Sequence, residues 1–265
     1  MDLQDPSTQL MFTTVPVHAH NNDGDDEIGT AFFYSLETNK DDVTVPLLIV
    51  NAHTVEDAHT ATVYLNSADN DGNPSGEAIP VRVQRDRLTA FHTRDLDLIA
   101  FPIGDVLNEL AQRGQNPFFK TITQELIPDN DTLNDLSAIE DVTFIGYPSG
   151  LMDRENSMPI ARRGVTATAV WNNYNGEPQF LIDAGVYPGS SGSPVFIFDR
   201  GHYTNAKGAL VAGSRLIFLG LISQTMVHEE QFDRAYLGLG KVIRTDAVTE
   251  YINAVSEELL PIDQN

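Results

Sequence analysis

Short apolar segments rich in Val, Ile, Phe and Tyr recur along the chain between clusters of Gly, Asn, Asp and Pro. Each is long enough for one strand, and the clearest are TAFFYSL (30–36), VPLLIVN (45–51), ATVYLN (61–66), DVTFIGY (141–147), PVFIF (194–198) and LIFLGLIS (216–223). Many short apolar segments separated by turn-forming residues are typical of β-strands. The pattern therefore predicts an all-β barrel or sandwich.

Two segments have apolar positions at helical spacing instead. DVLNELAQRG (105–114) ends at Gly114, a residue that commonly stops a helix. The segment TDAVTEYINAVSEELL (245–260) begins with Thr245, a capping candidate. Its apolar residues fall on one face of the predicted C-terminal helix: Val248, Tyr251, Ile252 and Val255.

The length and composition allow one large domain or two small ones and exclude several classes of partner. The 265 residues are 41% hydrophobic, which is enough to build a core. The 38 acidic and 16 basic residues give a net charge of -22, so nucleic acid and anionic membranes would be repelled. The chain has no cysteine and no apolar run near the roughly 20 residues that span a bilayer. We expect a soluble cytoplasmic protein without nucleic-acid or membrane partners.

Three acidic stretches could supply oxygen ligands to calcium: NNDGDDE (21–27), NSADNDGNPSGE (66–77) and PDNDTLND (128–135). None has EF-hand spacing, because a loop beginning at Asp69 would hold Pro74 at the position that requires glycine. Solvated loops are the better interpretation, and no metal or cofactor is expected.

The segment YPGSSGSPVF (187–196) is the strongest candidate for chemistry. It places two glycines and three serines between apolar flanks, whereas a flexible linker would have polar flanks. Glycine in a buried turn permits unusual backbone conformations and leaves room for N–H groups to face a substrate oxygen. The turn alone is compatible with an ordinary structural turn or with a loop that carries a nucleophilic serine.

A nucleophilic serine needs a base, and the base needs an orienting carboxylate. His53 is the candidate base because it closes the apolar strand VPLLIVNAH (45–53). Asp97 lies inside the apolar segment DLDLIAFPI (95–103), where a carboxylate is costly unless it is paired. Asp95 would lie on the same strand face and is the alternative candidate for the orienting carboxylate. The non-catalytic explanation of Asp97 is an aspartate at the start of a strand that caps a turn.

The order His53, Asp97, Ser191 is that of chymotrypsin, and four segments resemble the trypsin-like (chymotrypsin-fold) serine peptidases, in the bacterial branch near HtrA-type and V8-type enzymes. These segments resemble the early G-T-G-F-F strand and the histidine, aspartate and serine boxes of the family: GTAFFY (29–34), IVNAHTV (49–55), DLDLIAF (95–101) and DAGVYPGSSGSPVF (183–196). They occur in the family's order.

The resemblance implies two six-stranded antiparallel β-barrels with a C-terminal helix and a site in the cleft between them. Ser191 would attack the scissile carbonyl, His53 would act as base and then acid, and Asp97 would hold the imidazole tautomer. The N–H groups of Gly189 and Ser191 would form the oxyanion hole. The family's digestive members carry an aspartate where this chain has Ser190, so activation by an ion pair with a new N-terminus is not expected.

The segment FLGLISQT (218–225) resembles the strand that lines the family's primary specificity pocket. The resemblance places Ser223 beside Asp97 and pairs the substrate backbone with Ser223, Gln224 and Thr225. Gly185, six residues before Ser191, occupies the pocket base and offers no carboxylate for Lys or Arg. Ile222 and Ser223 stand where glutamate-selective relatives place a histidine. The implied preference is for an apolar or small polar side chain.

The predicted organisation is one peptidase domain over residues 1–265 of a bacterial protein, with no PDZ-like module. The N-terminal barrel covers 1–125, the C-terminal barrel 126–244, and the helix and tail 245–265. The predicted function is a serine endopeptidase that cuts one or a few protein substrates through an acyl-enzyme, with narrow specificity or with a site gated by a regulatory partner. The alternatives are a catalytically silent or latent binding module, an esterase with the same triad, and a purely structural serine turn.

Overall fold

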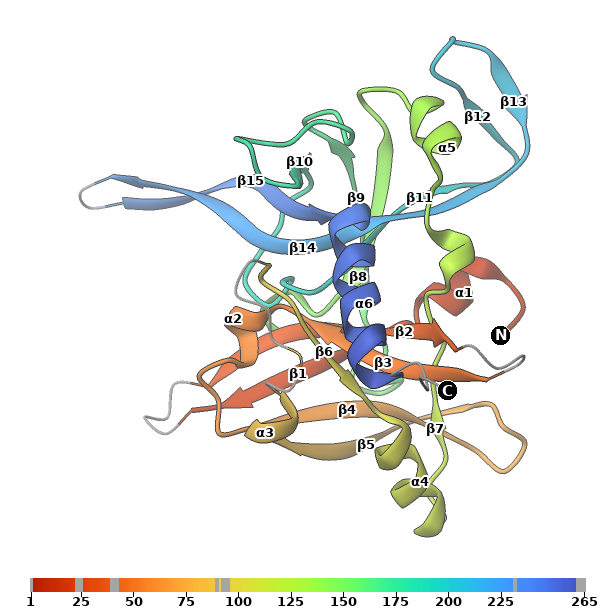
Figure 1. Ribbon diagram of the computed structural model, residues 1–265, viewed down its shortest axis with the longest axis vertical. Helices are drawn as coiled ribbons and strands as arrows, with labels where there is room; N and C mark the ends of the chain where they lie inside the picture. The colour runs from red at the N-terminus through yellow and green to blue at the C-terminus, as the bar shows by residue number, and fades with distance from the viewer. Residues whose placement is uncertain are drawn as a thin grey trace, which may run out of the picture.

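The computed structural model describes residues 2–21, 26–38, 43–88, 91, 96–230 and 233–260. The described chain forms two β-sheet systems, one from each half, and helix α6 (Thr245–Leu259) lies across both of them (Figure 1). The prediction of a mainly β fold with a C-terminal helix is confirmed. Among the described residues, no helix is long and apolar enough to cross a membrane.

The described strands of the N-terminal half form one antiparallel sheet of seven strands in the order β5–β4–β1–β2–β3–β6, with β7 paired to β4. They are β1 (Thr14–His20), β2 (Glu27–Glu37), β3 (Thr44–Val50), β4 (Thr60–Ala68), β5 (Pro74–Gln84), β6 (Ile99–Pro102) and β7 (Pro117–Phe118). In the described ladders this half is a second sheet system beside the closed barrel of the other half. The short β6 pairs along its whole length with β3, and no described ladder joins it to β5.

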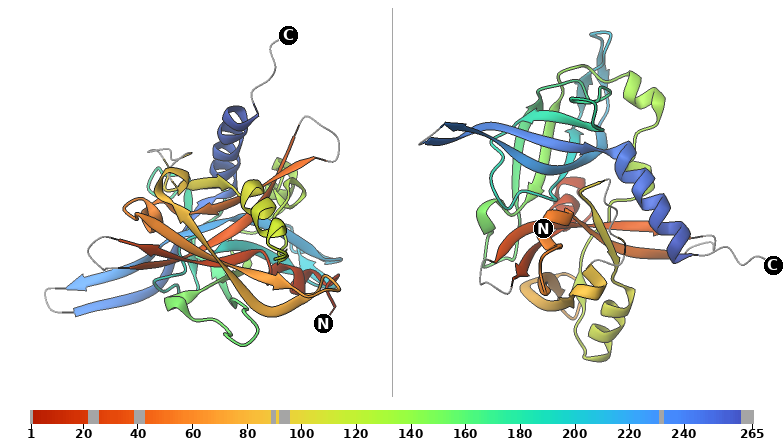
Figure 2. Two further views of the ribbon diagram at one scale, coloured as in Figure 1. Left: turned by 90° about the horizontal axis from the view of Figure 1, so that it is seen from below. Right: turned by 60° about the vertical axis from the view of Figure 1, so that its left-hand side comes forward.

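The C-terminal half is a closed barrel in the order β10–β15–β14–β11–β8–β9. Its strands are β8 (Asp141–Gly146), β9 (Ile160–Thr166), β10 (Gln179–Asp183), β11 (Pro194–Asp199), β14 (Arg215–Glu230) and β15 (Asp233–Arg244). A small hairpin, β12 (His202–Thr204) and β13 (Leu210–Ala212), separates β11 from β14. The β14–β15 hairpin is longer than its neighbours and projects from the body of the molecule (Figures 1 and 2).

Both predicted helices are present. α4 (Gly104–Gln112) ends next to Gly114, whose N–H donates to Ala111 O at 3.0 Å. In α6 the four predicted apolar residues are buried in a cluster that also contains Leu98 and Ala100 of the N-terminal half. Tyr251 fixes this contact, since its hydroxyl accepts a 2.7 Å hydrogen bond from Ala100 N. The helix thus ties the two halves together.

The cap of α6 differs from the prediction. Arg244 is the N-cap residue, with extended backbone, and Thr245 is already the first helical residue. The remaining short helices lie in connections: α1 (Pro6–Leu10), α2 (Ala52–Val55), α3 (Arg85–Leu88), η1 (Gln124–Leu126), α5 (Asn130–Asn134) and η2 (Pro148–Gly150). The boundary at residues 125/126 stays a prediction.

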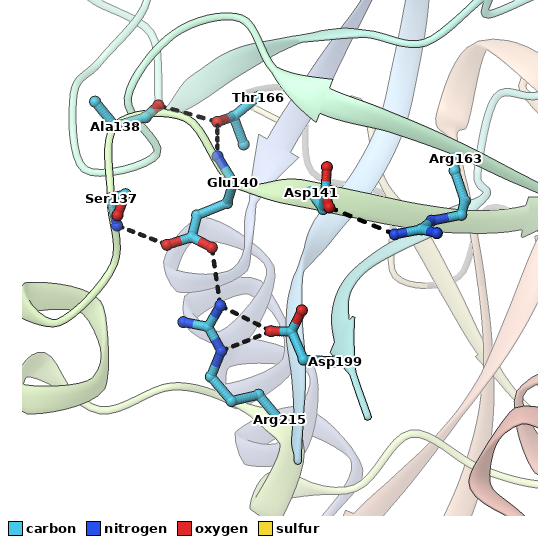
Figure 3. Close-up of polar contacts among 8 residues, drawn as sticks. All are labelled: Ser137, Ala138, Glu140, Asp141, Arg163, Thr166, Asp199 and Arg215. Carbon is cyan, nitrogen blue, oxygen red and sulfur yellow. Dashed lines mark hydrogen bonds and ion pairs between the residues drawn. The ribbon is translucent and has the colours of Figure 1, made fainter. Parts of the chain in front are cut away.

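A buried ionic cluster holds three parts of the C-terminal barrel together (Figure 3). Arg215 at the start of β14 bonds to Glu140 Oε2 at 2.9 Å and to Asp199 Oδ2 at 2.7 Å, and its side chain is only 10% exposed. Glu140 also accepts a hydrogen bond from Ser137 N at 2.6 Å, while the guanidinium lies 4.1 Å from the ring centroid of Tyr203 in β12. The buried carboxylate of Glu140 and the partly buried one of Asp199 thus balance one cation that is largely removed from solvent.

Candidate active site

His53 lies where the sequence predicts, at the end of an apolar strand. β3 ends at Val50 and Asn51 keeps an extended backbone, so the one-turn helix α2 begins at Ala52 and carries His53. The His53 side chain is 44% exposed, whereas Val50 and Ala52 on either side are buried. The strand therefore fixes the backbone while the imidazole stays accessible.

Asp97 lies in the turn before β6 rather than inside the strand, which corrects the sequence interpretation. The burial signal came from Leu98 and Ile99, which are fully buried, whereas the Asp97 side chain is 34% exposed. Its carboxylate accepts hydrogen bonds from His53 Nδ1 at 2.7 Å and from His53 N at 2.9 Å. The expected pairing is thus present. Asp95, the alternative, lies outside the described residues.

Asn51 is a residue to which sequence reasoning gave no role. Its Nδ2 donates to Asp97 O at 2.9 Å and to Asp97 Oδ2 at 3.1 Å, so it helps to fix the carboxylate oxygen that also binds His53 Nδ1. Asn51 is fully buried. A buried amide within the apolar segment IVNAHTV (49–55) is the signal that could have identified it, because buried polar groups need partners.

Two opposing effects act on the pKa of His53. Desolvation is the largest single effect and lowers it, because burial disfavours the imidazolium. The hydrogen bond and the charge of Asp97, helped by Glu27 and Glu56, raise it, and together they outweigh desolvation. The pKa of His53 therefore lies above its ordinary value of 6.5. This is the behaviour of a base whose protonated form is stabilised by a carboxylate.

The three serines of the turn have different environments, and only one is accessible. Ser190 and Ser193 are each 1% exposed. The Ser193 hydroxyl donates a long hydrogen bond, 3.4 Å, to Thr30 Oγ1. Ser191 is partly exposed and lines the same cleft as His53. Its hydroxyl donates to Ser223 O at 3.3 Å, and no hydrogen bond in the described part of the chain joins it to His53.

The backbone of the turn presents two N–H groups that have no partner. Across the described residues, neither Gly189 N nor Ser191 N donates to a protein acceptor. Ser149 N in η2 donates to Pro188 O at 2.6 Å. The carbonyl of Pro188 and the N–H of Gly189 belong to one peptide unit, so the Gly189 N–H points away from Ser149. Gly189 has φ +84, and a Cβ there would lie 2.7 Å from Tyr147 O, so the position requires glycine.

Thr30 of β2 is the second residue that sequence reasoning missed. Its buried hydroxyl donates to Gly189 O at 3.0 Å and accepts from Tyr147 N at 3.1 Å. Its backbone N–H donates to Ser191 O at 2.8 Å. A Cβ on Gly192, which has φ +87, would lie 1.8 Å from Thr30 O. The serine turn is therefore locked against a strand of the N-terminal half.

The site is a cleft of about 530 Å³ whose lining includes most of the predicted residues. Those that line it are His53, Asp97, Gln179, Pro188, Ser191, Ser223, Gln224, Thr225, Val227 and Lys241. Ile222 is not brought to the cleft, because its side chain is fully buried in the core of the C-terminal barrel. Ser223 lines the cleft with Asp97, but its hydroxyl donates to Lys241 O at 3.5 Å.

A hydrogen bond bridges the two segments expected to form the walls of the primary pocket. Thr225 Oγ1 donates to Val186 O at 2.7 Å. Val186 is buried, and a Cβ on Gly240 would lie 2.5 Å from Val186 Cγ2, so this side is tightly packed. Gly185 lies next to the guanidinium of Arg162 and does not line the cleft. The Thr225 side chain is therefore held between these two walls.

The described parts of the acidic stretches have local structural roles. Asp69 accepts hydrogen bonds from the backbone N–H groups of Asp71 and Asn73 in the β4–β5 turn, and Asp129 caps α5 through Thr132 N. Within the described ranges, no group of three or more His, Asp or Glu side chains is arranged to hold a metal ion.

Comparison with known families identifies the family to which the chain belongs. The family model of the trypsin-like peptidase domain matches residues 29–203, well over half of the chain. The chain belongs to the trypsin-like peptidase family. The matched range contains His53, Asp97 and Ser191, in the order in which the sequence places them. No curated protein sequence matches this chain.

Solved structures confirm the chymotrypsin-like fold expected for the family. An HtrA-type protease, AlgW, solved with a tripeptide, has a TM-score of 0.57 at 16% identity, and the match covers 98% of this chain and 65% of that one. Deg5 has a TM-score of 0.51 at 14% identity, covering 91% and 88% of the two chains. An inactivated protease paralogue from the scabies mite has a TM-score of 0.51 at 12% identity, covering 95% and 98%. Because one of these proteins is inactivated, the fold alone does not determine activity.

Proposed function

We propose that this member of the trypsin-like peptidase family is a serine endopeptidase that hydrolyses one or a few protein substrates, with Ser191 as nucleophile, His53 as general base and Asp97 as its orienting carboxylate. The observation that carries the proposal is the shared cleft. The His53–Asp97 pair and the one accessible serine of the glycine-rich turn line the same cavity.

The chemistry follows from these positions. Ser191 Oγ forms a bond to the scissile carbonyl carbon while its proton passes to His53 Nε2, and Asp97 stabilises the resulting imidazolium. The carbonyl oxygen becomes an oxyanion that accepts hydrogen bonds from Gly189 N and Ser191 N. His53 then protonates the leaving amine as the C–N bond breaks, which leaves an acyl-enzyme. Water, deprotonated by His53, releases the acid and restores Ser191.

Before attack the Ser191 hydroxyl must leave Ser223 O, to which it donates at 3.3 Å. One rotation about χ1 changes the direction of the hydroxyl without moving the backbone, and catalytic hydrogen bonds are often made only when substrate is bound. We infer that a bound substrate strand favours this rotation, because it pairs with the backbone of β14 next to Ser223.

The hydrogen bond between Thr225 and Val186 supports a preference for a small side chain at the residue before the cleaved bond, because it joins the two walls of the pocket that would receive this side chain. The Thr225–Val186 hydrogen bond spans the two walls, and Val186 packs against Gly240 on the same side. Peptides with Ala or Ser at this position should be cleaved faster than peptides with Phe or Arg. Thr225→Gly should reduce this discrimination, whereas Thr38→Gly should not, because Thr38 does not line the cleft and its hydroxyl donates to Val43 O.

A catalytically silent or latent binding module is the second candidate. The orientation of the Ser191 hydroxyl toward Ser223 O, and the Thr225–Val186 hydrogen bond across the walls of the pocket, favour it. Measuring peptide hydrolysis by the wild type and by Ser191→Ala separates the two functions. Turnover that disappears in Ser191→Ala supports the endopeptidase, whereas tight binding of peptides by both proteins, without cleavage, supports the module.

A further inference from the structure

Lys241 is a positively charged residue in the cleft of a strongly acidic protein. It lies on β15 directly opposite Gln224 of β14, so the two side chains share one face of the sheet. Its Nζ donates to Gln224 Oε1 at 2.9 Å. Both side chains line the same cavity as His53 and Ser191.

The charge of Lys241 is not balanced by a carboxylate. No ion pair joins it to an Asp or Glu in the described part of the chain, and there its one side-chain partner is the neutral amide of Gln224. The chain carries 38 acidic and 16 basic residues, so carboxylates outnumber the basic side chains that could pair with them. Of the three N–H donors of an ammonium group, Gln224 occupies one. Two donors remain for a ligand.

The alternation of side chains along a strand indicates which part of a substrate would meet Lys241. Thr225 points toward Val186 in the C-terminal barrel, and the neighbouring Gln224 points to the opposite face of β14. A substrate strand added to β14 also alternates. When its side chain before the cleaved bond points to Thr225, the preceding side chain points to the face of Gln224 and Lys241.

We propose that Lys241 is a specificity-determining residue that selects Asp or Glu as the second residue on the N-terminal side of the cleaved bond. The substrate carboxylate binds Nζ of Lys241, and the Gln224 amide holds the ammonium group in place. The inference rests on the proposed endopeptidase function and adds the class of substrate: a polypeptide with an acidic side chain followed by a small one.

The test is a comparison of kcat/KM for three peptides that differ only at this position, with Glu, Gln or Lys. A partly exposed ion pair predicts a Glu over Gln preference of about fivefold in the wild type. Lys241→Met should reduce the ratio to about one, and Lys241→Glu should make the Lys peptide the best substrate. Lys207→Met is the matched control, because Lys207 lies in the β12–β13 turn, and it should keep the wild-type ratio.

Salt dependence separates charge recognition from a structural role of Lys241. Raising the ionic strength from about 0.05 M to about 0.5 M should lower the Glu over Gln ratio in the wild type and leave it unchanged in Lys241→Met. Thermal unfolding of each variant establishes that it is folded. A wild type without a preference, or a Lys241→Met protein with the wild-type ratio, would overturn the role of Lys241.

Labelling by a fluorophosphonate distinguishes this inference from the proposed function, because that probe carries no peptide. A protein that is labelled at Ser191 and cleaves all three peptides equally has the proposed function but lacks this specificity. A folded protein that is neither labelled nor active on any peptide lacks the proposed function, and the inference about Lys241 fails with it.

Discussion

Replacing Asp97 by asparagine should remove the function of His53 while leaving the fold intact. The carboxylate accepts from three donors: His53 Nδ1, His53 N and Asn51 Nδ2. An amide has one oxygen and one NH2 group, so it cannot accept at both positions. If the NH2 group faces His53 N, two donors meet, at a cost of about 1–3 kcal/mol.

The other orientation places the NH2 group against His53 Nδ1. The imidazole then has to accept at Nδ1, which puts its proton on Nε2, and a protonated Nε2 cannot accept the proton of Ser191. Such a change of tautomer typically lowers kcat by about 10⁴. At about 1.36 kcal/mol for each factor of ten, this loss corresponds to about 5.4 kcal/mol of the barrier.

The pH dependence provides an independent measurement. His53 must be neutral to act as base, so kcat/KM should rise with pH through its raised pKa, above 6.5. Asp97→Asn removes the charge that raises this pKa, so the residual activity should rise at lower pH than in the wild type. The assay is peptide hydrolysis from about pH 5 to 9.

Asp141→Asn is the control, since Asp141 forms an exposed pair with Arg163, and it should change neither rate nor profile. An Asp97→Asn protein that keeps its rate within tenfold of the wild type, with the same pH profile, would refute the proposed role of the pair.

Three further substitutions test the support of the site. Thr30→Val leaves Gly189 O without its donor, and should slow hydrolysis about tenfold or more with a loss of stability of about 1–3 kcal/mol, measured by urea unfolding and steady-state kinetics. Arg215→Met leaves the buried carboxylate of Glu140 and the partly buried carboxylate of Asp199 without their cation, and should cost about 3 kcal/mol in the same unfolding assay, against less than about 1 kcal/mol for the exposed Arg163→Met. Ser193→Ala removes a long hydrogen bond and should keep most of the activity, so a complete loss would point to the wrong nucleophile.

Much of the fold could be predicted because strand and helix signals are local. The apolar segments and the spacing of Val248, Tyr251, Ile252 and Val255 predict elements that the structure contains. The order of the strands in the N-terminal sheet, β5–β4–β1–β2–β3–β6 in the described ladders, could not be predicted, because pairing between strands distant in sequence is not encoded in their composition.

In the candidate site, too, local signals could be predicted from the sequence and contacts between distant segments could not. His53 and Ser191 were predicted from the segments that contain them, whereas Asn51, Thr30 and Lys241 act through contacts that only the folded chain creates. Ile222 was placed at the site by resemblance of its segment, yet the pleat of β14 points it into the core.

Whether Ser191 is an activated nucleophile can be measured by the intact mass of the protein after treatment with a fluorophosphonate. An activated Ser191 gives one adduct on the wild type and on Ser193→Ala, and none on Ser191→Ala. An adduct that persists in Ser191→Ala, or a folded wild type that forms none, would contradict the proposed role of Ser191.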